Sequence, residues 1–126
     1  MYGIEIVPDA IQDAIYNAGI NAIKKSYFIA GKAEMLLEQD PAFAQACDET
    51  ECIIVDPPRD GLHKNVVHFL NALRARKQFK LLYISCNPVT LARDIDMLSE
   101  QFKVRIMQPV DMFPHTHHIE NICLMS

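Results

Sequence analysis

Short apolar runs alternate with amphipathic helical segments along almost the whole chain, and this alternation constrains the fold more than any other feature. The runs that read as strands are 2–7, 26–30, 52–56, 81–85, 103–110 and 120–125. The segments with helical periodicity are 9–19, 31–47, 64–76 and 88–99. Strands that are apolar on both faces and alternate with helices indicate an α/β fold with a mostly parallel sheet covered on both sides.

Three local signals refine this outline. Gly19 is expected to end the first helix, and the second is expected to break at Asp40-Pro41 because proline cannot continue a hydrogen-bonded turn. No helix separates the last two strands, so the simplest interpretation is an antiparallel pair at one edge of the sheet.

Length, charge and cysteine usage limit the functional classes. A chain of 126 residues is expected to form one domain, and its net charge of -4 gives no general attraction to a polyanion. RNA binding would therefore need a local basic patch or other domains. The sequence has no CxxC pair among its four cysteines, no signal peptide and no apolar run of membrane-spanning length, which favours a reduced, cytoplasmic compartment and no membrane partner.

Ligands of open α/β sheets bind beyond the carboxyl ends of the strands, so the residues that follow each strand are candidates for a site. Glu5 lies near the end of the first run, where it either accepts hydrogen bonds from ribose hydroxyls or is a solvated carboxylate. Asp56 ends the third run and opens the segment DPPRDGL, whose two prolines stiffen the backbone. This loop either preorganises Asp56 and Arg59 for a site or is a rigid turn capped by Asp56.

Cys86 follows the fourth strand in the segment SCNP, where a helix begins. A thiol at such a junction is partly exposed, and the donors of a helix N-terminus stabilise the nucleophilic thiolate. Position alone leaves two interpretations open, a catalytic cysteine and a packed one. Cys52 and Cys123 lie inside apolar runs and read as small buried hydrophobes.

The segment PHTHHIE holds three histidines and a glutamate within seven residues. One interpretation is a zinc or iron site formed by His115, His117, His118 and Glu120. Adjacent histidines point to opposite sides of an extended segment, and no second ligand cluster is present, so no metal is predicted. The other interpretation makes Glu120 a general base or acid at the sheet edge.

Taken together and in this order, GIEIVPDAI, DPPRDGL, YISCNP and FPHTHHIE resemble the C-terminal catalytic domain of the RNA uracil-C5 methyltransferase family. The resemblance runs across the whole chain and implies a Rossmann-like class I methyltransferase fold. It also implies S-adenosylmethionine as methyl donor and a uridine in RNA as substrate. The segment QPVDMFPHTHHIEN is similar in style to bacterial members that act on large-subunit ribosomal RNA, which favours rRNA over tRNA.

The same resemblance implies roles for four residues. Cys86 would attack C6 of the uracil, and Glu120 would remove the C5 proton. Glu5 would hold the ribose hydroxyls of the cofactor, and Asp56 would lie beside the cofactor and the target base. The covalent step has a physical reason: C5 of uracil is a poor nucleophile, and a thiolate at C6 turns it into an enolate carbon.

The six strands match the second to seventh strands of that family's sheet. Residues 1–126 are therefore expected to form a partial methyltransferase domain that lacks the first strand and its Gly-rich cofactor loop, and to be inactive in isolation. In the family's order the missing strand lies between those that match 2–7 and 52–56, which leaves two unpaired edges. We predict that these strands pair directly, or that self-association supplies a strand from a second chain.

Two other functions are compatible with parts of the sequence. A non-catalytic RNA-processing module could retain a methyltransferase-like core, but it would have no need of Cys86 or Glu120. An amino-methyltransferase is suggested by Asp56-Pro57-Pro58, which is similar to the (D/N)PP(Y/F) motif. Arg59 in place of the aromatic residue, together with Cys86, argues against it.

Overall fold

The computed structural model describes residues 1–116 and 119–126, which divide into two compact units, Met1–Ala46 and Cys47–Ser126. The strands are β1 (Tyr2–Glu5), β2 (Tyr27–Ala30), β3 (Cys52–Val55), β4 (Lys80–Ser85), β5 (Val104–Val110) and β6 (Glu120–Met125). The helices are α1 (Pro8–Ile20), α2 (Ala33–Gln39), α3 (Pro41–Glu49), α4 (Lys64–Arg76) and α5 (Pro88–Leu98). Within the described residues, no helix has the length and hydropathy needed to cross a membrane.

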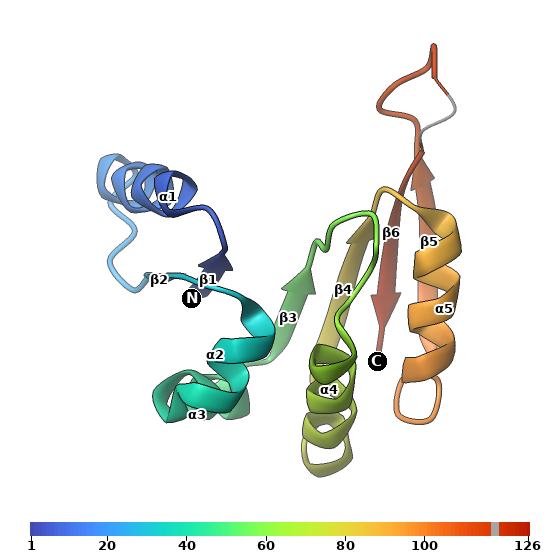
Figure 1. Cartoon of the computed structure of the whole chain (residues 1–126), viewed down its shortest axis with the longest axis horizontal. Helices are drawn as coiled ribbons and strands as arrows, with labels where there is room; N and C mark the ends of the chain where they lie inside the picture. The colour runs from blue at the N-terminus through green and yellow to red at the C-terminus, as the bar shows by residue number, and fades with distance from the viewer. Residues whose placement is uncertain (117–118) are drawn as a thin grey trace. The chain divides into compact units, whose positions relative to one another are not determined.

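The first unit contains a two-stranded parallel sheet, in which α1 connects β1 to β2 (Figure 1). The register runs from Tyr2 opposite Tyr27 to Glu5 opposite Ala30. The break that the sequence predicts at Asp40-Pro41 is present, because α2 ends at Gln39 and α3 begins at Pro41. Helix α1 buries Ile11 and Ala18 and connects the strands in the manner of a parallel crossover.

Gly19 does not end the first helix, contrary to the sequence-based prediction. It lies inside α1, and the positive φ of 55° that follows the helix falls on Ala22. The Ile23 N–H donates to the Ala18 carbonyl at 2.9 Å, and the Asn21 side chain donates to the Asn17 carbonyl at 2.8 Å. These bonds satisfy the last carbonyls of the helix without a glycine.

The second unit contains a four-stranded sheet in the order β3-β4-β6-β5 (Figure 1). Strands β3 and β4 are parallel, and β6 is antiparallel to both β4 and β5. Three of the four strands therefore run in one direction. The predicted antiparallel pairing of the last two strands is confirmed. Of this pair, β5 forms one edge of the sheet, and β6 lies between β5 and β4.

Helices α4 and α5 pack against one face of this sheet (Figure 1). The residues of this layer that are 0% exposed include Leu73, Leu81, Leu98, Cys123 and Met125. On the opposite face Ile54, Ile106 and Ile122 are 63%, 56% and 36% exposed, respectively. The prediction of a sheet covered on both sides is therefore wrong for this face in the described structure.

The two strands that flank the missing position do not pair with each other. In the described residues β1 pairs with β2 alone and β3 with β4 alone, so the predicted direct pairing of these two strands is wrong. An unpaired strand edge is costly only where water cannot reach it, and both Cys52 and Ile54 of β3 are exposed. Pairing with a strand from a second chain stays a prediction.

Replacing Leu98 by alanine should lower the free energy of unfolding by about 2–5 kcal/mol, because it leaves a cavity under α5. Met97 precedes it on the same helix and is 38% exposed, so Met97→Ala is the matched control, expected to cost under about 1 kcal/mol. Urea unfolding followed by circular dichroism measures both. Equal losses for the two variants would contradict this packing of α5.

Candidate active site

The sheet of the second unit brings Asp56, Cys86 and Glu120 to one edge. Ser85 pairs with Asn121, so Cys86 lies one residue beyond the ladder, level with Glu120 at the start of β6. Glu120 pairs with Val110 on its other side. Asp56 follows Val55, which pairs with Tyr83, and it therefore lies at the same end of the sheet.

A cavity of about 350 Å³ opens at this edge. Its lining comprises Asp56, Ile84, Cys86, Val110, Met112, Phe113, Glu120 and Ile122. Its volume falls within the range of about 300–1,000 Å³ that is usual for small-molecule sites. Its walls are mostly apolar, and its polar groups include the Cys86 thiol and the carboxyl groups of Asp56 and Glu120.

The backbone around Cys86 is fixed by its neighbours in the SCNP segment. The Ser85 hydroxyl donates to the Asn87 carbonyl at 3.0 Å and accepts from the Asn87 N–H at 3.1 Å. The Asn87 side chain caps α5 by accepting from the Val89 N–H at 3.0 Å. Pro88 has no N–H, and the N–H groups of Asn87 and Val89 are already bonded to the Ser85 hydroxyl and the Asn87 side chain.

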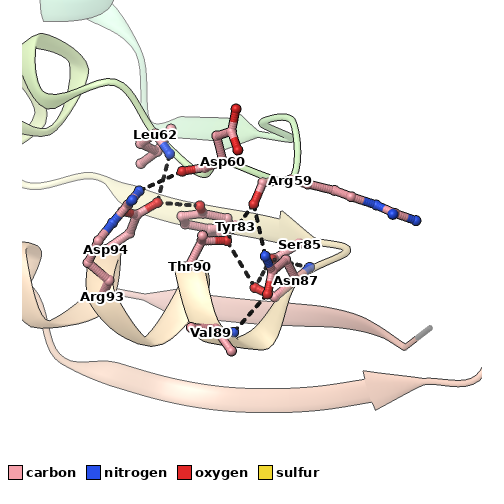
Figure 2. A network of polar contacts seen from close by, with 10 residues as sticks. All are labelled: Arg59, Asp60, Leu62, Tyr83, Ser85, Asn87, Val89, Thr90, Arg93 and Asp94. Atoms are coloured by element: carbon pink, nitrogen blue, oxygen red, sulfur yellow. Dashed lines mark hydrogen bonds and ion pairs between the residues drawn. The ribbon is translucent and has the colours of Figure 1, made fainter. Parts of the chain in front are cut away.

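A buried carboxylate joins this segment to the loop that carries Asp56 (Figure 2). Asp94 of α5 is 0% exposed and accepts from the Leu62 N–H at 2.7 Å and the Tyr83 hydroxyl at 2.6 Å. It also accepts from the Arg93 guanidinium at 2.9 and 2.7 Å. Burial and the hydrogen bond to Asp94 raise the pKa of Tyr83, so its hydroxyl keeps the proton that it donates.

Sequence reasoning missed Asp94, although a signal was present. Leu91, Ile95 and Leu98 form the inner stripe that the periodicity of α5 predicts, and Asp94 lies within the same stripe. A charged residue on the inner face of an amphipathic helix requires a buried partner, which here comes from another loop and another strand.

The loop between Asp56 and Leu62 approaches α5 closely at Gly61. Gly61 has φ of +81°, and a Cβ there would lie 2.5 Å from both an Arg93 nitrogen and an Asp94 oxygen. The Arg59 carbonyl accepts from the Asn87 amide at 3.0 Å and from the Thr90 hydroxyl at 3.0 Å. The glycine of the DPPRDGL segment is therefore a condition for this contact.

Glu5 belongs to the first unit, where it is the last residue of β1 and is exposed. One of its carboxylate oxygens accepts from the Val7 N–H at 2.9 Å, and the Glu5 carbonyl accepts from the Gly31 N–H at 2.9 Å. The carboxylate thus lies at the carboxyl end of a parallel strand, as the sequence predicts. Its role toward a cofactor stays a prediction.

Of the three histidines of PHTHHIE, the structure describes His115, which is not among the residues that line the cavity. His115 is exposed, while His117 and His118 lie outside the described residues. Within residues 1–116 and 119–126, no group of three or more His, Cys, Asp or Glu side chains could hold a metal ion.

The four cysteines are all free thiols, in different surroundings. Burial raises the pKa of Cys47 to about 11 and also raises that of Cys123. Cys52 is exposed, so the prediction that it is buried is wrong: on β3 it lies on the same side as Ile54, which is 63% exposed. Cys86 is half-buried and lines the cavity.

A model of the tRNA (uracil-5-)-methyltransferase family matches residues 3–126. The chain belongs to this family. The resemblance that the four motifs carry is therefore confirmed at the level of the family. The assignment of the six strands to the second to seventh strands of the family's sheet stays a prediction.

Relatives in this family are much longer than the chain. It is 46% identical to an uncharacterised RNA methyltransferase from Bacteroides thetaiotaomicron, over 98% of this chain and 26% of that protein. It is 42% identical to one from Listeria monocytogenes, again over 98% and 26%. The chain thus spans about a quarter of the length of these relatives.

Solved structures confirm the class I methyltransferase fold. The tRNA (uracil-54, C5)-methyltransferase of Pyrococcus abyssi, in complex with S-adenosyl-L-homocysteine, superposes with a TM-score of 0.76 at 31% identity, over 99% of this chain and 28% of that one. TrmN from Thermus thermophilus gives 0.65 at 18% identity, over 99% and 35%, and supports the fold alone.

The surroundings of the thiols predict an order of chemical reactivity. At pH 8 iodoacetamide should modify Cys52 and Cys86 well before Cys47 and Cys123, because burial keeps the latter two protonated and covered. Mass spectrometry of the digested protein measures each site, and unfolding in urea should make all four react. Rapid modification of Cys47 in the folded protein would contradict its burial.

The raised pKa of Cys47 predicts that the free energy of unfolding falls as pH rises from about 9 to 11, because in that range the thiol ionises in the unfolded chain but stays protonated in the folded one.

Proposed function

We propose that the intact protein is an RNA (uracil-5-)-methyltransferase that acts through a covalent bond between Cys86 and C6 of the target uracil. The observation that supports this most is the cavity in which Cys86, Asp56 and Glu120 meet, in a chain of this family. A non-catalytic module of the same fold would not need a thiol and two carboxylates around one apolar cavity.

The three residues divide the chemistry of the reaction. The Cys86 sulfur adds to C6, and the electron pair of the C5–C6 double bond moves onto C5 and the adjoining carbonyl as an enolate. After C5 has been methylated, the Glu120 carboxylate takes the C5 proton. The C6–S bond then breaks, the double bond returns and Cys86 leaves as a thiolate. Asp56, on the cavity wall, holds the ring where these steps occur.

The cofactor proposed is S-adenosylmethionine, which when bound supplies an electrophilic methyl group to C5. The family member from Pyrococcus abyssi was solved in complex with S-adenosyl-L-homocysteine, which supports this cofactor. Glu5 fits a role in holding ribose hydroxyls: it is an exposed carboxylate at the end of a parallel strand, with one oxygen already anchored by the Val7 N–H.

The proposed substrate class is a uridine in RNA. The style of the last motif favours ribosomal RNA, whereas the family description and the Pyrococcus abyssi enzyme name tRNA. The rRNA assignment thus stays a prediction, which mapping of 5-methyluridine in both RNA classes with and without the gene would test. Four unpaired cysteines favour a reducing, cytoplasmic location.

Replacing Cys86 by alanine in the intact protein should abolish methyl transfer to RNA, because among the described residues that line the cavity Cys86 is the only thiol that can form the C6 adduct. Cys52→Ala is the matched control: it removes an exposed thiol outside the cavity and should leave the rate within about twofold of the wild-type rate. Incorporation of a labelled methyl group into RNA is the measurement. Normal turnover by Cys86→Ala would end the proposed mechanism.

Replacing Glu120 by glutamine should let the adduct form but block its resolution, because an amide does not take up the C5 proton. A fraction of the protein is then expected to migrate with RNA on a denaturing gel. The control is Glu100→Gln, which changes an exposed carboxylate beyond the end of α5. Turnover by Glu120→Gln at the wild-type rate, without accumulated adduct, would assign the base elsewhere.

A further inference from the structure

We infer that Asp94 is a positioning residue for this reaction: it holds the 56–62 loop against the first turns of α5 and so fixes Asp56 relative to Cys86. The inference rests on the proposed function. Asp94 does not line the cavity and touches no reacting atom, so its effect passes through the segments that it joins.

The two oxygens of Asp94 hold different partners. Oδ2 accepts from the Leu62 N–H and the Tyr83 hydroxyl, which ties the end of the loop to β4. Oδ1 accepts from two nitrogens of Arg93, whose Nη2 also donates to the Asp60 carbonyl at 2.8 Å (Figure 2). The buried carboxylate therefore holds the loop at two points. It bonds the Leu62 N–H directly, and it reaches the Asp60 carbonyl through Arg93.

A second set of bonds continues this contact toward the cavity. The Thr90 hydroxyl and the Asn87 amide donate to the Arg59 carbonyl, and Asn87 adjoins Cys86 in the chain. Arg59 is separated from Asp56 only by Pro57 and Pro58, whose φ angles are fixed by their rings. Little backbone freedom therefore remains between the anchored carbonyl and Asp56.

Stability alone is a poor explanation for this arrangement. The Arg93 side chain is 49% exposed, so its ion pair with Asp94 is weakened by solvent and contributes little against the cost of burying the Asp94 carboxylate. A charge at this fully buried position therefore needs another reason. Every bond of Asp94 outside its own helix ends on the 56–62 loop or on β4, the two segments that lead to Asp56 and Cys86. Catalytic geometry is sensitive to such supports, because a displacement of about 1 Å can cost about 100-fold in rate.

The test is Asp94→Asn in the intact protein. The asparagine oxygen can still accept from Leu62 and Tyr83, but its amide group cannot accept from Arg93, so the link to Asp60 is lost. We expect kcat for RNA methylation to fall about 10- to 100-fold, with KM for RNA within about threefold. Asp96→Asn makes the same change on the exposed side of α5 and should leave kcat unchanged.

Thr90 supplies a second variant that keeps the buried carboxylate. Thr90→Val removes one donor to the Arg59 carbonyl without changing the shape of the side chain, and should lower kcat about tenfold. Thr90→Ser restores the hydroxyl and should recover the wild-type rate. If these bonds served stability alone, the variants would melt at lower temperatures than the wild-type protein but would show the wild-type kcat at temperatures where they are folded.

Amide hydrogen exchange tests the loop without any reaction. Asp94→Asn should speed exchange about tenfold at Gly61, whose N–H donates to the Pro58 carbonyl inside the loop, while Asp96→Asn should not. Wild-type kcat in both Asp94→Asn and Thr90→Val, or unchanged exchange at Gly61 in Asp94→Asn, would overturn the inference. An intact wild-type protein that methylates no uridine would instead overturn the proposed function, and the exchange experiment would still decide whether Asp94 holds the loop.

Discussion

The candidate site depends on one buried carboxylate. Asp94 is 0% exposed and joins segments that are distant in sequence, because it accepts hydrogen bonds from Leu62 and Tyr83 as well as from its neighbour Arg93. In a low-dielectric interior such bonds are strong when all partners are present and costly when one is missing. The 56–62 loop and the start of α5 are therefore held together, and the residues that adjoin them, Asp56 and Cys86, both line the cavity.

Much of the fold could be predicted from periodicity. Helix α4 has the bounds that the sequence indicates, 64–76, because its apolar side chains recur at helical spacing. The insertion of β6 between β4 and β5 could not be predicted, because local sequence does not say which strand will be its neighbour. The direct pairing expected across the missing strand position is not present among the described residues, where β1 pairs with β2 and β3 pairs with β4.

The site was predictable where chemistry follows the end of a strand. Cys86 and Asp56 come directly after the parallel strands β4 and β3, and Glu120 is the first residue of β6, which runs antiparallel to them, so all three lie at one edge of the sheet. The hydrogen bonds of Asp94 that hold the site's loop were not predictable in the same way. The burial of Asp94 and its hydrogen-bond donors depend on the 56–62 loop, about 30 residues earlier in the chain. The one signal in the sequence was the position of Asp94 within the apolar stripe of α5.

Methyl transfer to C5 of a uracil through Cys86 is tested most directly with RNA that carries tritium at C5 of uridine. The proposed chemistry removes this hydrogen once for each methyl group added, because Glu120 takes it before Cys86 leaves. We expect the intact protein to release one tritium per methyl group transferred, and Cys86→Ala to release none. Methyl transfer without release of tritium would place the methyl group on another atom and contradict the account.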